Sequence, residues 1–473
     1  MAAEASGRAP RSARWVLPAL AWALAGLPAP ARAHASDQGL VLLLPTDVYI
    51  AAGSLVVALT VLLLTILPDD AVRRLFRPAR LWRQGPPRAW HATSMASCAL
   101  LLALIWAGLA GPHDPLRNPL PLFVWTVFWV GFVSIQGLFG NLWVWVNPWS
   151  GPAAALRRFG LRPVLRLPPR LGHALAVLLF LGFAAFLLAD PAPADPTRLA
   201  RIVGLYWAAT LLAVLVFGPR WLRRAECFTV FLSSYARIGV FGRRGGRLRA
   251  GLPGWKLLAG RAPPAGLALF MIAMLATGSF DGLNETFWWL GVLGINPLEF
   301  PGRSAVTVQN LTGLLLANAA LLAVFSLTVW LGLKLVRSDM APRLALRLFA
   351  PTLLPIALGY HVAHYLTAIL VDGQYALVAL SDPLGRGHDL LGLGEFYVTT
   401  GFFNTPASVR AIWLSQAGAV VAGHVVSVML AHGNAVRAFG SGRRAALSQA
   451  PLVLFMVAYT VFGLWLLASP RGL

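Results

Sequence analysis

Long apolar runs separated by short polar segments dominate the sequence. Ten of these runs approach the ~20 residues that an α-helix needs to cross the hydrocarbon core of a membrane. The pattern therefore predicts an all-α, polytopic transmembrane helix bundle with about ten spans, at 46–67, 91–110, 120–141, 171–189, 201–218, 264–280, 309–333, 349–371, 411–431 and 448–468. The run 285–296 is too short to cross and is expected to lie at the interface or to re-enter the membrane.

The amino-acid composition also indicates a lipid environment. Charged residues make up 12% of the chain and hydrophobic residues 58%, whereas a soluble domain carries about 25% charged residues. A lipid bilayer is therefore the expected environment. The net charge of +22 does not indicate nucleic acid as a partner, because the arginines stand in short loops between apolar runs and not on one basic face.

The first 33 residues have the features of a secretory signal peptide. Arg8, Arg11 and Arg14 precede the apolar stretch 15–27, and Ala31-Arg32-Ala33 forms a small-x-small cleavage site. The mature chain, 34–473, is then one multi-span membrane domain. Two alternatives are cleavage after Ala35 and an uncleaved signal anchor. Cleavage after Ala33 would leave His34 first, with an amine and an imidazole that could bind copper.

The loops alternate in charge, which predicts the orientation of the chain. Five alternate loops hold 28 Lys and Arg residues, and the opposite set holds six. Because cytoplasmic loops are rich in these residues, we expect a bacterial inner-membrane protein whose mature N-terminus and C-terminus both lie outside. The large basic loop, 219–263, is expected to contact anionic lipid headgroups at the cytoplasmic face. Its apolar middle, 228–241, is expected to lie on the membrane surface.

Histidines are the candidate functional residues within the predicted spans. With these span limits no Asp, Glu, Lys or Arg lies mid-membrane, where ionisable groups usually have a function. His361 and His364 are three residues apart and share one helical face. His424 lies in the next span at a comparable depth. We therefore expect these three imidazoles to converge between antiparallel helices.

Three neutral imidazoles suit a divalent metal, either zinc or copper. Zinc would lower the pKa of a bound water to about 7 and supply a hydroxide nucleophile. Asp382 and His388 in the turn-rich outer loop are candidate catalytic residues, for proton transfer or for orienting an imidazole. The alternatives are that the histidines only pack helices through hydrogen bonds and that the loop only builds turns.

Several short motifs along the chain can be compared with known families. They are His34-Ala35 with Pro45, Asn147-Pro148-Trp149, Ser279-Phe280-Asp281-Gly282, Gly359-Tyr360, Ala363-His364-Tyr365, Ser381 to Asp389, Gly423-His424, Ala431-His432, and Ser448-Gln449 with Pro451. With these motifs the chain resembles a family of bacterial integral membrane proteins commonly labelled fenitrothion hydrolase. The resemblance covers most of 34–468 and is weaker in 219–263. It implies a membrane-bound hydrolase of organophosphate triesters, in which water attacks phosphorus and expels a nitrophenolate.

Three functions therefore remain open. The first is a metal-dependent hydrolase of lipophilic esters or phosphoesters, which uses the three histidines. The second is a transporter or metal-handling protein with an intramembrane histidine site. The third is a structural or assembly factor. The sequence contains no G-x-S-x-G, Walker or H-E-x-x-H motif, so common serine hydrolases, nucleotide-driven proteins and zincins are not indicated.

Overall fold

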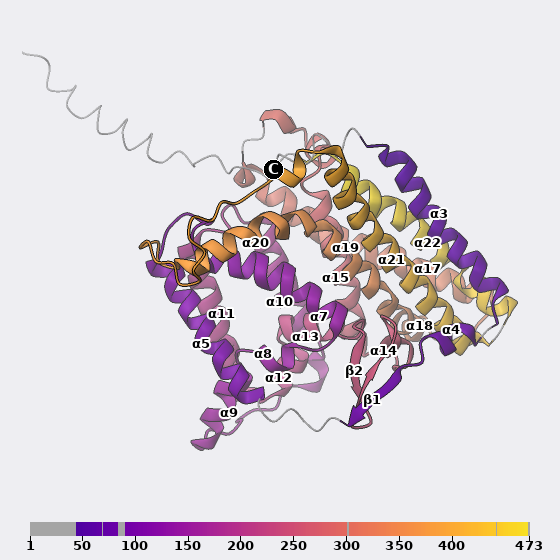
Figure 1. Cartoon of the computed structure of the whole chain (residues 1–473). Helices are drawn as coiled ribbons and strands as arrows, with labels where there is room; N and C mark the ends of the chain where they lie inside the picture. The colour runs from indigo at the N-terminus through magenta and orange to yellow at the C-terminus, as the bar shows by residue number, and fades with distance from the viewer. Residues whose placement is uncertain (1–43, 69, 84–89, 300–301, 441, 472–473) are drawn as a thin grey trace, which may run out of the picture.

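The computed structural model describes residues 44–68, 70–83, 90–299, 302–440 and 442–471 (Figure 1). The predicted signal peptide, its cleavage sites and His34 lie outside the described residues. Within the described part, nine helical segments are long and apolar enough to cross a membrane, which confirms the predicted all-α polytopic bundle. They are α3 (Thr46–Ile66), α5 (Trp90–Ala110), continuous α6–η2–α7 (Pro119–Leu122, Phe123–Phe132, Val133–Phe139), α11 (Pro196–Phe217), α15 (Ala265–Leu283), η5–α17 (Arg303–Val306, Thr307–Leu335), α18–η6–α19 (Pro342–Phe349, Ala350–Leu353, Leu354–His364), α21 (Pro406–Phe439) and α22 (Arg443–Ala468).

Two predicted spans differ from the helices that form. The span expected at 171–189 is a 16-residue helix, α10 (Ala174–Ala189). It begins late because the short turn η3 (Pro169–Leu171) is followed by Gly172 in a left-handed conformation. The span expected at 349–371 ends at the last residue of α19, and the chain then turns into α20 (Leu366–Ser381). This helix runs across the molecule, transverse to α19 and α21 (Figure 1).

Short helices connect the long ones. The segment expected to be too short to cross contains only the six-residue helix α16. The short elements are α4 (Ala71–Leu75), α8 (Trp143–Val146), α9 (Ser150–Arg158), α12 (Arg220–Arg224), α13 (Cys227–Tyr235), α14 (Trp255–Leu258), α16 (Phe287–Val292), η4 (Pro297–Glu299) and η7 (Gly401–Phe403).

A small antiparallel sheet lies at one end of the bundle, at the bottom of Figure 1. Its strands β1 (Ala79–Arg83), β2 (Phe241–Arg244) and β3 (Arg247–Ala250) are ordered β1-β3-β2. Gly245 and Gly246, both with positive φ, form the two-residue turn between β2 and β3. The sheet joins the α3–α5 connection to the predicted basic loop, so that arginines from two distant parts of the sequence share one surface.

The prediction that 228–241 lies on the membrane surface is wrong for α13. This helix packs into the main hydrophobic core, and Phe231, Leu232 and Tyr235 are buried. The helix can be buried because backbone N–H groups in its first turn find a hydrogen-bond acceptor in the residue just before it. Glu226 is fully buried and accepts hydrogen bonds from the backbone N–H groups of Phe228 and Thr229 at 2.8 and 2.6 Å. Burial raises the pKa of the Glu226 carboxyl.

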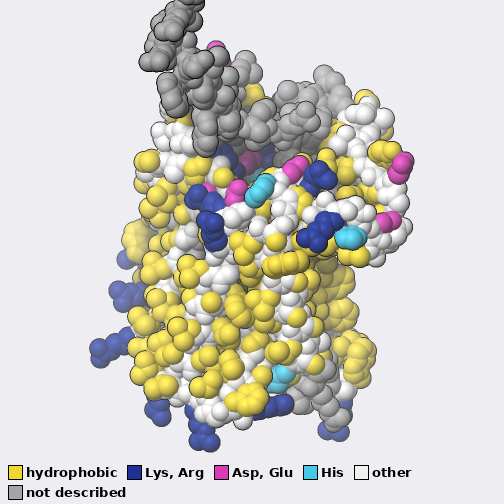
Figure 2. All heavy atoms as spheres, turned by 90° about the vertical axis from the view of Figure 1, so that its left-hand side faces the viewer, with side chains coloured by type: hydrophobic (Ala, Val, Ile, Leu, Met, Phe, Trp, Pro, Cys, Tyr) yellow, Lys and Arg dark blue, Asp and Glu magenta, His cyan; other side chains and the backbone are white. Residues whose placement is uncertain are grey.

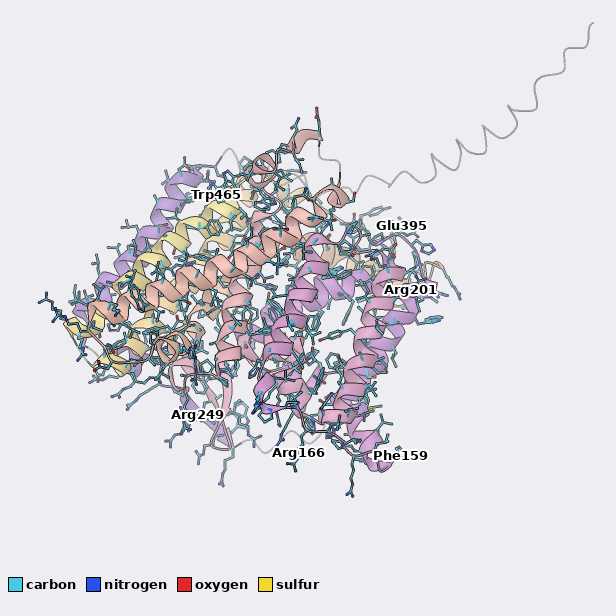
Figure 3. All side chains as sticks on the ribbon, turned by 180° about the vertical axis from the view of Figure 1, so that it is seen from behind. Phe159, Arg166, Arg201, Arg249, Glu395 and Trp465 are labelled. Carbon is cyan, nitrogen blue, oxygen red and sulfur yellow. The ribbon has the colours of Figure 1, made fainter. Side chains whose placement is uncertain are left out.

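The two ends of the bundle differ in charge. On the face that carries α5 and α11, apolar side chains cover the middle, Asp and Glu appear only in the upper part, and the lowest part carries Lys and Arg (Figure 2). Arg166 and Arg249 lie at the lower end, whereas Arg201 and Glu395 lie at the upper end (Figure 3). The positive-inside rule produces this kind of asymmetry. The assignment of the lower end to the cytoplasm remains a prediction.

Glycines allow α19 and α21 to approach closely. A Cβ atom at Gly359 would lie 2.5 Å from the carbonyl oxygen of Ala419, and one at Gly423 would lie 2.5 Å from that of Pro355. Small residues permit such backbone contact between helices in membranes. The contact fixes the position of α19 along the axis of α21, and therefore the depth of the histidines on α19.

We predict that Gly423→Ala destabilises the protein by about 1–3 kcal/mol, because the added methyl group overpacks a rigid backbone contact. Gly418→Ala on the same helix is the matched control, since a Cβ there meets no atom within 4 Å. The free energy of unfolding in detergent measures both effects. Equal stability of the two variants would contradict the contact described here.

Candidate functional site

One face of α19 and one face of α15 enclose a small buried cavity. The cavity-lining residues of α19 are Ala357, Tyr360, His361, His364 and, just after the helix, Tyr365. Their spacing of three and four residues is that of a single helical face. The cavity has a volume of about 30 Å³. One water molecule needs roughly 10–15 Å³ of such space, so the cavity is of the size of one or two water molecules.

The facing side of α15 carries Met274, Thr277, Gly278 and Asp281. These positions also follow the helical repeat. The expectation was that no carboxylate lies mid-membrane, and the predicted span ended just before Asp281. Helix α15 continues to Leu283, beyond the predicted end at 280, and Asp281 is buried in its last turns.

Asp281 is held by two partners from α19 and the residue that follows it. The hydroxyl of Tyr365 donates a hydrogen bond to Asp281 Oδ2 at 2.5 Å. His364 Nε2 lies 3.4 Å from the same oxygen, which is within ion-pair distance and longer than an ordinary hydrogen bond. A buried carboxylate without partners is costly, so these contacts explain how the bundle tolerates it.

Aromatic rings fix the position of His364. The ring of Tyr360 stacks on it, with 5.6 Å between centroids and 16° between the planes. The Tyr360 hydroxyl fits because residue 282 is glycine, where a Cβ would lie 1.6 Å from that oxygen. His364 Nδ1 and the Tyr360 hydroxyl have no hydrogen-bond partner among the described residues. The site therefore contains a buried acceptor and a buried hydroxyl that remain available.

His361 is anchored on a different element. Its Nε2 lies 2.9 Å from the carbonyl oxygen of Trp129, in the π-helical segment η2. Because a carbonyl only accepts, this nitrogen must carry the proton, and Nδ1 keeps its lone pair. Trp129 also packs edge-on against the imidazole, at 5.4 Å between centroids. Functional sites often contain π-helical turns, which alter the direction of backbone groups.

The structure brings His361 and His364 to one cavity but does not bring His424 to it. His424 Nδ1 bonds the carbonyl oxygen of Val420 at 2.9 Å, and its ring faces Tyr459 at 6.4 Å between centroids. No group of three His, Cys, Asp or Glu in the described parts of the chain is placed to hold a metal ion. The zinc or copper site on these three histidines stays a prediction that this arrangement does not fit.

Asp382 and His388 lie away from the histidines. Helix α20 separates Tyr365 from Asp382, which corresponds to about 24 Å along the helix. Asp382 accepts the backbone N–H groups of Arg386 and Gly387 at 2.9 and 2.7 Å, in an exposed turn. Slight desolvation opposes these bonds, but together they hold the pKa of Asp382 below its ordinary value. The catalytic role predicted for both residues has no geometric support here.

The sequence reasoning missed Asp281, Tyr360, Tyr365 and Trp129 as parts of the site. A signal was present for Asp281, because 274, 277, 278 and 281 share one helical face. No pattern in the sequence indicated that the carbonyl of Trp129 would contribute to the site. Comparison of the chain with known protein families, with curated proteins and with solved structures gives no match.

We expect Tyr365→Phe to lower the free energy of unfolding by about 1–3 kcal/mol, because it leaves a buried carboxylate with one donor fewer. Tyr397→Phe is the matched control. Its hydroxyl also bonds a carboxylate, that of Glu395 at 3.2 Å, but on an exposed loop. Denaturant titration in detergent gives both values. The same small loss in both variants would show that the Tyr365–Asp281 bond contributes little.

In the outer loop, Asp382→Ala should increase the rate of trypsin cleavage after Arg386 several-fold, because two backbone N–H groups lose their acceptor. Glu395→Ala in the same outer segment removes a carboxylate whose side-chain partner, within the described part of the chain, is the exposed Tyr397 hydroxyl, so it should leave the rate unchanged. Mass spectrometry of timed digests measures the cleavage. An unchanged rate in Asp382→Ala would mean that the turn does not depend on this carboxylate.

Proposed function

We propose that the chain is a membrane hydrolase of lipophilic esters, with phosphoesters as the first class to test, in which Asp281 and His364 activate water. The observation that carries the proposal is the buried Asp281–His364 pair at 3.4 Å, beside a cavity of about the size of one or two water molecules. Paired carboxylate and imidazole groups commonly act as an orienting residue and a general base. The resemblance noted in the sequence points to the same reaction class.

Each residue has a defined task in this mechanism. Asp281 orients His364 through Nε2, which leaves the unpartnered Nδ1 as the base. As the water oxygen bonds to phosphorus or to a carbonyl carbon, its proton passes to Nδ1. The bond to the leaving oxygen then breaks and releases an alcohol or a phenol, which takes up the proton from His364. The unpartnered Tyr360 hydroxyl can donate to the oxygen that gains negative charge.

Low polarity would strengthen these electrostatic contacts. Tyr235, Phe231 and Phe180 line the cavity beside the polar groups. Water-excluded surroundings increase the value of a preorganised hydrogen-bond donor. They also favour a substrate that dissolves in the bilayer over one that is charged. The proposed substrate is therefore a neutral ester or phosphotriester.

A second candidate is proton-coupled transport, which one specific observation favours. A second polar group lies outside the cavity: the hydroxyl of Ser279 on α15 bonds that of Tyr459 at 2.5 Å, and the ring of Tyr459 lies 6.4 Å from that of His424 between centroids. Chains of buried carboxylates and histidines serve as proton paths in pumps and transporters. Both candidates use Asp281, so the experiment has to separate them by reaction product.

In the hydrolase, His364→Gln should lower kcat/KM by roughly 10²–10⁴-fold, the usual contribution of a general base. The assay follows nitrophenolate release from a dialkyl nitrophenyl phosphate and from a nitrophenyl acyl ester, with purified protein in nanodiscs. Asp281→Asn should also lower the rate. His113→Gln, which changes an exposed histidine, should not.

Full activity of His364→Gln, with wild-type stability, would reject the assigned base. Absence of hydrolysis by the wild-type protein, for both esters, would reject the hydrolase itself. Proton flux into liposomes that is lost in Asp281→Asn, without hydrolysis, would instead support the transporter.

A further inference from the structure

A second and much larger pocket lies beside the cavity. It has a volume of about 530 Å³ and is bordered by α5, η2, α10, α11 and α13. Small-molecule sites usually have volumes of about 300–1,000 Å³. Aromatic side chains supply much of its wall, among them Phe128, Trp143, Phe183 and Trp207. The polar cavity, at about 30 Å³, is too small for the ester itself, so a substrate of the proposed reaction would need a larger space such as this one.

The polar atoms in the pocket wall already have partners within the protein. Trp143 Nε1 donates to the Thr229 hydroxyl at 2.9 Å, and the Tyr206 hydroxyl donates to Glu226 at 2.5 Å. The indole N–H groups of Trp125, Trp149 and Trp207 bond backbone carbonyls, and so does the hydroxyl of Ser97. Among the described residues, the wall therefore offers aromatic faces and hydrocarbon, and the side-chain donors named here already have partners.

The pocket also lies where a bilayer would supply its ligand. Ser97 and Leu101 are near the middle of α5, and Gly182 is near the middle of α10. For helices that cross a membrane, these positions are at the depth of the hydrocarbon core. A molecule that reaches the pocket sideways comes from lipid, where charged and strongly polar groups are rare.

We propose that this pocket is a binding site for a neutral hydrocarbon group of a molecule dissolved in the bilayer. Ring-bearing groups gain offset or edge-on contacts with the aromatic wall. A lipid acyl chain shares the same chemistry and is the other source of such a group. The satisfied donors and the absence of Lys, Arg, Asp and Glu from the described lining exclude a charged headgroup as the part that enters.

Two aromatic rings separate the pocket from the polar cavity. Phe183 lines the pocket and packs on Trp129 at 4.8 Å between centroids, and Trp129 packs on His361 at 5.4 Å. A substrate whose apolar part occupies the pocket would thus be separated by the rings of Phe183 and Trp129 from the polar cavity, which His364 lines. Binding itself does not depend on the proposed hydrolysis, and it can be tested separately.

Gly182→Leu adds a side chain at the pocket wall, where a Cβ meets no atom within 4 Å. Gly418→Leu, on an exposed face of α21 where a Cβ also meets no atom within 4 Å, is the matched control. The full-length protein in nanodiscs is photolabelled with a neutral phenyl diazirine or with a phosphatidylcholine that carries a diazirine in its acyl chain. Labelled peptides from α10 and α11 are quantified by mass spectrometry.

Gly182→Leu should reduce labelling of these peptides at least about fivefold, while Gly418→Leu should not. Loss with the phenyl probe identifies a ring-bearing ligand, and loss with the lipid probe alone identifies an acyl chain. Unchanged labelling by both probes would overturn the proposal. If the protein hydrolyses nitrophenyl esters, Gly182→Leu should raise KM more than it lowers kcat. If the protein does not hydrolyse them, the labelling experiment still tests binding on its own.

Discussion

The burial of one carboxylate determines how the rest of the site is arranged. Asp281 lies in the last turns of an apolar helix, where an uncompensated charge would be very unfavourable. Its hydrogen-bond and ion-pair partners must therefore come from a neighbouring element that is held at the same depth in the bundle. Tyr365 and His364 supply them at the end of α19. Tyr365 keeps a helical backbone bond, from its N–H to the carbonyl of His361 at 3.2 Å, and the chain turns into α20 only after it.

The surrounding elements place this polar group next to a purely apolar space. On one side, η2 supplies both a carbonyl acceptor for His361 and an aromatic ring that closes the cavity. On the other, α21 presses against α19 through glycine backbone contacts. The polar cavity and the aromatic pocket have opposite chemistry and share the wall formed by Phe183 and Trp129. Such an arrangement suits a molecule with one apolar part and one reactive centre.

The sequence predicted most of the helices and half of the site. His361 and His364 were identifiable because helical spacing places them on one face, and this needs no knowledge of neighbouring helices. Asp281 was missed because the apolar run was ended one residue too early, where hydropathy falls but the helix continues. The placement of His424 required the rotation of α21 about its axis, which depends on the contacts of Gly359 and Gly423. The π-helical turns of η2 depend on packing and left no local pattern.

The length of α10 has a consequence for the membrane around it. Its 16 residues span about 24 Å, less than the ~30 Å of an average hydrocarbon core. A short helix at the boundary is accommodated by local thinning of the bilayer or by headgroups drawn inward. On the side of the bundle that carries α10, hydrophobic mismatch would bring interfacial water closer to the Asp281 carboxylate than it would be in a bilayer of average thickness. Water at the headgroups would then help to hydrate the buried carboxylate.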